Sequence, residues 1–182
     1  MAKITLVATL ICDTLIEMME TQPFEKIKVT ELIKIAGIGR STFYDHFDSI
    51  FAAIQFIEDN FMAGLLTEES ISNKLATDSE IFDGHKYIRD NMRIYRALCG
   101  PNGDPAFQAR LTNRIKRLYK RKLESLPSRR TYTETCMISE YAAGGIWSLY
   151  KWWAFHEEEV SIVEVKKLTQ ELRAMIEDAI CK

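Results

Sequence analysis

The sequence predicts an all-α protein of about nine helices, and three observations support this prediction. Apolar residues recur every three or four positions along most of the chain, which is the spacing of one helix face. The alternation of β-branched and polar residues that marks strands is nearly absent. Only four prolines and eight glycines interrupt the 182 residues, so little in the sequence breaks long helices.

Four helices are predicted in the first part of the chain. The first ends before Pro23, and its apolar stripe consists of Val7, Ile11, Leu15 and Met18. Two short helices follow, at about Thr30–Ala36 and Arg40–His46, separated by the residues 37–39. A longer fourth helix is predicted from the stripe Ile50, Ile54, Ile57, Phe61 and Leu65.

The middle of the chain predicts helices separated by a polar linker and a turn-rich loop. Polar residues around 70–77 precede a helical pattern from Ile81 to Cys99, which is expected to break in two at Asp90-Asn91. Residues 100–105 are dense in glycine, proline, asparagine and aspartate and predict a loop. An amphipathic helix closed near Pro127 follows, with the stripe Phe107, Leu111, Ile115, Leu118 and Leu126.

The last two predicted helices, at about 131–156 and 161–180, are unusually apolar. The first is apolar on several sides, which is typical of a helix buried on more than one side. The second begins at the capping-box pattern Ser161-x-x-Glu164. Together they carry more apolar surface than a monomer of this length readily covers, so they predict a homodimer interface.

Composition and motifs exclude several classes of protein. With 24 Lys+Arg against 26 Asp+Glu the net charge is −2, and composition alone therefore argues against a nucleic-acid partner. Four scattered cysteines and three isolated histidines predict reduced thiols, a cytoplasmic protein and no metal. No apolar run is long enough to span a membrane, and no catalytic motif is present, so we expect neither an enzyme nor a cofactor.

Residues Val29–Phe47 nevertheless predict a helix-turn-helix, whose second helix enters the DNA major groove. Gly37 suits the left-handed conformation that ends the first helix. Leu32, Ala36 and Ile38 would pack against Phe43 and Phe47, which lie four positions apart on one face of the second helix. The side chains left near or on the outer surface are Arg40, Ser41, Thr42, Tyr44 and His46.

The sequence here resembles the TetR family of bacterial transcription regulators. The matching segments are the amphipathic first helix, the block PFEKIKVTELIKIAGIGRSTFYDHF (Pro23–Phe47) and the long fourth helix. ALCGPNGDPAF (Ala97–Phe107) and GIWSLYKWW (Gly145–Trp153) resemble the C-terminal domain of one branch of that family. The resemblance implies a three-helix DNA-binding head, here residues 1–62, and a regulatory and dimerisation body, here residues 63–182.

The resemblance also implies which side chains meet DNA. Thr30 would contact a phosphate, and the start of the recognition helix, at Gly39, Arg40, Ser41 and Thr42, would approach the groove. Arg40 is the expected base reader, because a guanidinium pairs with guanine in bidentate fashion. Tyr44 and His46 would fix the register of the head through backbone contacts.

The head departs from the family in its charge. Relatives commonly place a basic residue where this chain has Asp45, and lysine where it has Asp48 and Ile50. Residues 1–60 contain five basic and nine acidic side chains, for a net charge of −4. Because phosphate contacts supply the sequence-independent part of affinity, we expect unusually weak non-specific DNA binding.

Two further features of the sequence, a basic segment and a set of aromatic residues, each allow two interpretations. The segment Arg110–Arg130 carries nine basic residues against one acidic residue, a net charge of +8, and is either an anion-binding surface or, as we favour, a solvated helix face. The aromatic side chains of the body either line an effector pocket or form core and dimer contacts; they are Phe82, Tyr87, Tyr95, Trp147, Tyr150, Trp152, Trp153 and Phe155.

The sequence and the resemblance together predict a bacterial, cytoplasmic regulator, by default a repressor. It would bind a palindromic double-stranded operator as a homodimer and be released by a small-molecule effector held in the body. The alternative is a helical protein-interaction module or co-regulator whose head has drifted from DNA binding, as Asp45, Asp48 and Ile50 suggest.

Overall fold

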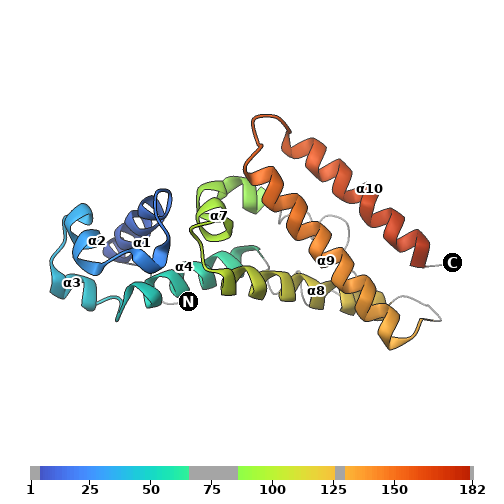
Figure 1. Ribbon diagram of the computed structural model, residues 1–182, viewed down its shortest axis with the longest axis horizontal. Helices are drawn as coiled ribbons and strands as arrows, with labels where there is room; N and C mark the ends of the chain where they lie inside the picture. The colour runs from blue at the N-terminus through green and yellow to red at the C-terminus, as the bar shows by residue number, and fades with distance from the viewer. Residues whose placement is uncertain (1–4, 66–85, 126–129, 181–182) are drawn as a thin grey trace. The chain divides into compact units, whose positions relative to one another are not determined.

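The computed structural model describes residues 5–65, 86–125 and 130–180, and within these every regular element is a helix (Figure 1). The all-α prediction is therefore confirmed. In chain order the helices are α1 (Leu6–Met19), the 3-10 helix η1 (Phe24–Lys26), α2 (Val29–Ala36), α3 (Arg40–Tyr44), α4 (Ile50–Leu65), α7 (Met92–Cys99), α8 (Pro105–Ser125), α9 (Tyr132–Ala154) and α10 (Ile162–Ile180). The polar linker predicted around 70–77 lies outside the described residues.

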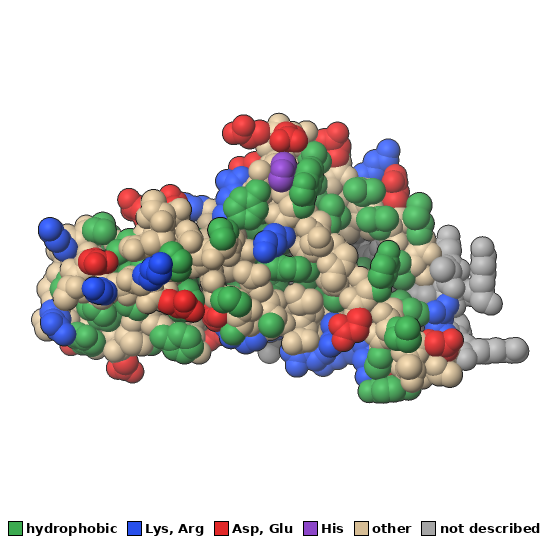
Figure 2. Space-filling model, viewed as in Figure 1, with side chains coloured by type: hydrophobic (Ala, Val, Ile, Leu, Met, Phe, Trp, Pro, Cys, Tyr) green, Lys and Arg blue, Asp and Glu red, His purple; other side chains and the backbone are tan. Residues whose placement is uncertain are grey.

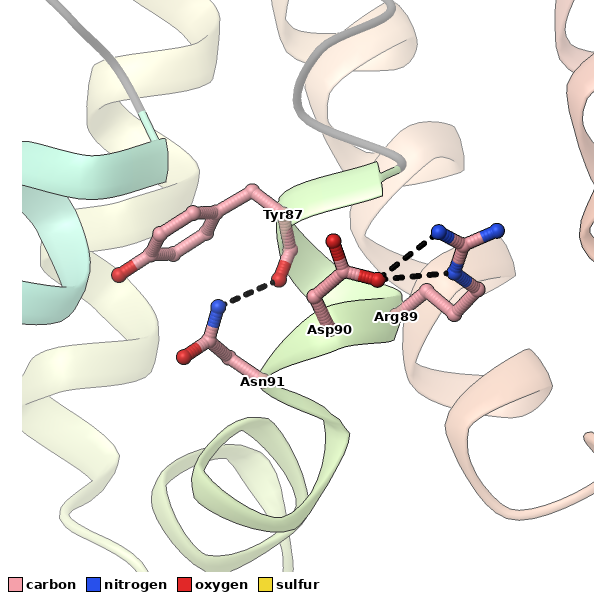
Figure 3. A network of polar contacts seen from close by, with 4 residues as sticks. All are labelled: Tyr87, Arg89, Asp90 and Asn91. Carbon is pink, nitrogen blue, oxygen red and sulfur yellow. Dashed lines mark hydrogen bonds and ion pairs between the residues drawn. The ribbon is translucent and has the colours of Figure 1, made fainter.

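The predicted helix break at Asp90-Asn91 is confirmed. Residues 86–90 are helical, Asn91 is a turn residue, and α7 begins at Met92. The side-chain amide of Asn91 donates a hydrogen bond of 2.9 Å to the Tyr87 carbonyl, while Arg89 and Asp90 form an exposed ion pair (Figure 3). Asparagine side chains compete with the helix for its own backbone groups in this way, which favours a break.

The chain divides into two compact units. The first unit comprises Met1–Gly64 with Arg93–Phe107, and the second comprises Leu65–Met92 with Gln108–Lys182. Helix α8 therefore starts in the first unit and continues into the second. The domain boundary at residue 62 stays a prediction. The compact unit that contains the head also includes residues 93–107, so the units do not correspond to one cut in the sequence.

The core of the first unit forms where the apolar stripes of α1, α2, α3 and α4 meet. The side chains with no exposed surface include Ile11, Leu15, Leu32, Phe43 and Ile54. Phe61 of α4 stacks on Tyr95 with ring centroids 5.9 Å apart and meets the edge of Phe107 at 6.4 Å. These two contacts fasten α7 and the start of α8 to α4.

In the second unit α9 and α10 lie side by side (Figure 1). Their buried residues include Ala142, Ala143, Tyr150, Trp153 and Val165. The indole N–H of Trp153 donates to the Val160 carbonyl at 3.0 Å, which fixes the connection between the two helices. Both helices begin with capping boxes, the predicted one at Ser161/Glu164 and a second at Thr131/Glu134.

Two predicted elements differ in detail. Helix α3 ends at Tyr44, two residues earlier than expected, because Asp45 and His46 form a turn that brings Phe47 back onto the core. The buried stripe of α8 continues through Tyr119 and Leu123, whereas Leu118 is only half-buried. A strict spacing of four therefore describes the buried face of α8 better than the mixed spacing predicted.

Candidate functional site

The turn between α2 and α3 has the geometry that its sequence predicts. Gly37 adopts φ 67° and ψ 30°, the left-handed conformation, and its N–H donates to the Ile33 carbonyl. The Ile38 N–H donates to the same carbonyl at 3.1 Å. This closes α2 with a glycine and lets the chain turn directly into α3.

Two phenylalanines, Phe43 in α3 and Phe47 after the turn that ends it, anchor this helix in the core. Phe43 has no exposed surface and Phe47 is buried, and their ring centroids lie 6.3 Å apart. Phe47 also meets Phe56 of α4 edge-on at 5.5 Å. Burial of Leu32, Phe43 and Phe47 thus bears out the inner face predicted for the helix-turn-helix.

The exposed side of α3 and the turn that follows it present the predicted DNA-contacting side chains. Arg40, Ser41 and Tyr44 are exposed, while Thr42 and His46 are half-buried. The guanidinium carbon of Arg40 lies 5.7 Å from the centre of the Tyr44 ring, within cation–π range. The structure therefore brings the predicted base reader and a predicted backbone-contacting residue together as one pair.

The other two predicted contacts lie at helix starts. Thr30 is exposed in the first turn of α2, and Gly39 immediately precedes α3 as its N-cap residue. A Cβ placed at Gly39 would meet only ordinary contacts, the nearest at 3.5 Å from the Thr42 hydroxyl. The fold itself does not need glycine at position 39, in contrast to the left-handed Gly37.

Acidic side chains flank this face. Asp45 directly follows α3 as its C-cap residue, and Asp48 lies three residues further on; both are exposed. Exposed carboxylates repel the phosphate backbone over distances set by the salt concentration. The surface that would face DNA thus combines a few placed donors with an unfavourable background charge.

A second surface, along α9 and α10, is apolar. Figure 2 shows hydrophobic side chains at the surface over these two helices. Tyr141 of α9 is 76% exposed and Met175 of α10 is 65% exposed. The large apolar residues exposed here are Tyr132, Met137, Tyr141, Trp152, Phe155, Val163, Leu168, Leu172 and Met175.

A groove of about 740 Å³ runs along this apolar surface, and we call it the α9–α10 groove. Its walls include Tyr141, Gly144, Gly145, Leu172, Met175 and Ile176. A Cβ added at Gly144 or Gly145 would meet nothing within 4 Å. None of the aromatic side chains proposed from sequence lines it; Tyr119 and Tyr141 do instead, and Phe82 lies outside the described residues.

The basic helix α8 uses part of its charge within its own unit. Lys116 forms a 2.6 Å ion pair with Glu140, and Lys120 donates to the Tyr132 hydroxyl at 3.1 Å. That hydrogen bond raises the pKa of the Lys120 ammonium, which also lies over the Tyr132 ring at 4.2 Å. These contacts favour the interpretation of α8 as a solvated structural face.

The described residues offer no group of three or more potential metal ligands, and no helix among them is long and apolar enough to cross a membrane. Burial, with a smaller contribution from Asp13, raises the pKa of the Cys12 thiol to about 12. A thiol with so high a pKa is a poor nucleophile and a poor metal ligand at neutral pH, because the thiolate is the reactive form.

Comparisons with known proteins decide the family. A TetR family model, described as a transcriptional regulator C-terminal region, matches residues 81–177, more than half of the chain. The chain belongs to the TetR family of transcription regulators. It is thus a DNA-binding transcription regulator, in a family defined by regulation rather than by catalysis. No curated protein sequence is significantly similar to this TetR-family chain.

Solved structures of similar fold agree with this assignment. A TetR transcriptional regulator from Streptococcus agalactiae superposes with a TM-score of 0.70, at 17% identity, over 91% of this chain and 92% of its own. The dihydroxyacetone kinase operon activator DhaS superposes with a TM-score of 0.66, also at 17% identity, over 96% of each chain. These two likenesses establish the fold over nearly the whole length.

Proposed function

We propose that this TetR-family regulator is a repressor that binds a palindromic operator as a homodimer and is released by a small-molecule effector in its body. The observation that carries the DNA contact is the two-sided α3. Phe43 and Phe47 anchor one face in the core, and Arg40, Ser41 and Tyr44 project from the other. A recognition helix needs this arrangement, because its base-reading side chains must be held still by packing behind them.

The proposed contacts divide into two kinds. Arg40 reads a base edge, and its position over Tyr44 limits the directions that the guanidinium can take. Gly39, Ser41 and Thr42 line the approach to the groove. Contacts to the DNA backbone come from Thr30, Tyr44 and His46, and these set register without reading sequence.

Selection of bound fragments from a random double-stranded library, followed by gel shifts at low salt, tests this assignment. Arg40→Ala should weaken binding to the selected site by about 10- to 100-fold and relax the preference at one base pair. Arg121→Ala is the matched control, since it removes an exposed arginine of α8 in the second unit. Equal losses for both variants would assign the DNA contact to general charge instead of α3.

The alternative remains a helical interaction module with a degenerate head, and the exposed Asp45 and Asp48 favour it. The same selection separates the two functions. Failure of the unmodified protein to enrich or shift any DNA at low salt would support the alternative. The sign of regulation needs a promoter reporter, in which loss of a repressor raises expression, whereas loss of an activator lowers it.

Dimerisation is proposed through α9 and α10, at about 131–156 and 161–180. The α9–α10 groove supports this, because its exposed Leu172 and Met175 stay in water in the monomer. Gly144 and Gly145 interrupt a long helix, where each costs about 1 kcal/mol relative to alanine. None of the described residues comes within 4 Å of a Cβ placed at either glycine, and a helix of a second copy that packs closely there would use this space.

Gly145→Leu tests the dimer directly. A Cβ at position 145 meets none of the described residues within 4 Å and leucine improves helix propensity, so the fold should be kept while the close approach of a second copy is blocked. Ala109→Leu on the exposed face of α8 adds the same bulk as a control. Sedimentation should show a monomer for Gly145→Leu only, and a persistent dimer would place the interface elsewhere.

Release is proposed to work through the spacing of the two heads. Two α3 helices enter successive major grooves about 34–36 Å apart, or a multiple of it, and an effector that changes this distance lowers operator affinity. Such coupling is reciprocal. Operator DNA should therefore weaken effector binding by the factor by which effector weakens operator binding.

A further inference from the structure

The corner between α7 and α8, residues Gly100–Asp104, is tightly built. A Cβ at Gly103 would lie 2.0 Å from the Leu98 carbonyl oxygen, so only glycine fits against the end of α7. The Asp104 carboxylate accepts from the Ala106 N–H at 2.8 Å, and Pro105 takes the first position of α8. Gly103 and Asp104 are also buried. Close packing and capping hold this corner in one conformation.

One residue of this corner, Asn102, holds the end of α1. Its side-chain amide donates to the Met19 carbonyl at 2.8 Å, across 83 positions of sequence. Its own carbonyl accepts from the Phe24 N–H at 3.1 Å. The two hydrogen bonds therefore hold the residues on either side of the turn that leads from α1 into η1.

The Met19 carbonyl is a group that α1 itself leaves without a helical partner, because the last carbonyls of a helix have no following N–H. The N–H groups of Thr21 and Gln22 both donate to Met18 instead. Asn102 therefore supplies a C-terminal cap from a distant part of the chain. Without its amide the end of α1 has one contact fewer to fix its direction.

A second contact beside Asn102 joins α7 to α1. The Arg93 guanidinium forms a 2.6 Å ion pair with Glu20, and that hydrogen bond raises the pKa of Arg93. Arg93 is also attracted by Glu17 and Asp13, so it faces the acidic edge of α1. Both side chains are about half exposed, and an exposed pair of this kind contributes little stability by itself.

We propose that Asn102 is a positioning residue of the DNA-binding head: through it the α7–α8 corner sets the direction of α1, and with it that of α2 and α3. Helix α1 packs against α2, and α2 against α3, so the direction of α1 is passed to the recognition helix. This inference rests on the proposed operator-binding function. To that function it adds one residue: Asn102, through which α7 and α8 hold the position of the recognition helix α3. Residues of both helices belong to the compact unit that contains the head.

Asn102→Asp tests the proposal, because it keeps the shape of the side chain and removes the N–H donor. Asn113→Asp is the matched control, an exposed asparagine of α8 that undergoes the same chemical change. Both variants are measured on the selected operator, on an isolated half-site, and on operators lengthened or shortened by one base pair between the half-sites. One base pair moves a half-site by about 3.4 Å and turns it by about a tenth of a turn.

We expect the unmodified protein and Asn113→Asp to lose at least about tenfold in affinity when the spacing changes, within the usual range of coupling between sites. Asn102→Asp should bind the half-site as well as the unmodified protein and lose less than about threefold on the altered spacings. A merely structural role would instead lower affinity for every DNA by a similar factor.

The outcomes that overturn the proposal are distinct from failure of the proposed function. If the unmodified protein binds no DNA, the operator-binding function fails, and the positioning role fails with it. If it binds and Asn102→Asp shows an unchanged spacing preference, only the positioning role is wrong. Flattened preferences in both Asn102→Asp and Asn113→Asp would assign the effect to added negative charge.

Discussion

The head and the α9–α10 pair are both built from amphipathic helices, yet the surfaces of α3 and of the α9–α10 pair differ in kind. Helices α1, α2 and α3 bury Ile11, Leu32 and Phe43 completely, and α3 presents polar and aromatic groups outward. The α9–α10 pair buries Trp153 and Val165 but leaves Tyr141 and Met175 largely in water. The exposed apolar residues of the α9–α10 pair line a groove, whereas the exposed side of the recognition helix is mostly polar.

The two regions also stabilise their helices differently. No side chain caps α2 or α3, and α3 has only five residues, too few to be stable alone. Helices α9 and α10 have 23 and 19 residues, and each begins with a capping box. The recognition helix therefore depends on tertiary packing, while α9 and α10 carry local stability of their own.

Truncation of the α3 anchor gives the largest expected effect. Phe43→Ala removes a side chain with no exposed surface and should lower the free energy of unfolding by about 3–5 kcal/mol. Tyr44→Ala, the next residue on the exposed face, should change stability by less than about 1 kcal/mol and lower operator affinity instead. Denaturant unfolding together with gel shifts measures both, and similar stability losses would contradict the two-sided helix.

The salt dependence of DNA binding should be shallow. A head of net charge −4 neutralises few phosphates, so the slope of log K against log salt should be shallower than about −4, which corresponds to about four phosphates. Fluorescence anisotropy on the selected operator between low and physiological salt gives this slope. A steep slope would mean that the basic helix α8 contributes to the DNA surface after all.

Protein concentration should affect the stability of the α9–α10 pair. Since a dimer is stabilised by mass action, each tenfold dilution should lower the apparent free energy of unfolding by about 1.4 kcal/mol. Calorimetry over a hundredfold range of concentration would show a moving midpoint. The Gly145→Leu variant should unfold at a midpoint independent of concentration, and a fixed midpoint for the unmodified protein would remove the contrast between the two regions.

Glycine substitutions in the head distinguish a glycine that the backbone conformation requires from one that only leaves room for DNA. Gly37→Ala should cost about 1–2 kcal/mol, because its φ of 67° is unfavourable for a residue with a Cβ. Gly39→Ala should leave stability nearly unchanged, as its Cβ meets only ordinary contacts. Thermal unfolding checks the first change, and operator affinity checks whether position 39 approaches DNA. An equal stability loss at both positions would contradict this distinction.

Acid should weaken the caps of α9 and α10 before it affects α2 and α3. Hydrogen bonds from Thr131 and Ser161 lower the pKa values of Glu134 and Glu164. Because the pKa of each carboxyl group is lower in the folded protein than in the unfolded chain, the ionised group stabilises the fold at any pH above its unfolded pKa. This stabilisation is lost as the pH falls through the folded pKa. Hydrogen exchange between neutral pH and pH 4 should therefore show earlier opening at the starts of α9 and α10, by a small factor. Glu164→Gln should remove the pH dependence at α10, and earlier opening of α2 would contradict it.

Local patterns in the sequence were sufficient for the head. Gly37, the Phe43/Phe47 pair and the Ser161/Glu164 cap each act over three or four residues, a range in which helical geometry alone fixes which side chains meet. The end of α3 was predicted two residues too late, because burial of Phe47 demands a turn that helical spacing does not reveal. The Thr131/Glu134 cap has the same pattern as the predicted one, so the same spacing rule is sufficient to find it.

Contacts between distant segments were beyond such patterns. The bond from Asn102 to Met19 depends on tertiary folding, and a polar residue in a turn-rich segment predicts only a loop. Similarly, the spacing of α9 predicted apolar faces but not the open space beside Gly144 and Gly145. Net charge is the least informative pattern, because the total of −2 averages an acidic head, the basic segment 110–130 and an acidic remainder.

Placement of residues 93–107 within the first compact unit has a practical consequence for chimeric regulators. A head transplanted with its break at residue 64 loses the Asn102 cap on Met19 and the aromatic contacts of Phe61. A working transplant of this head therefore takes two separate stretches of sequence. The second stretch contains the Gly103 corner, and the helices of the recipient must join onto it.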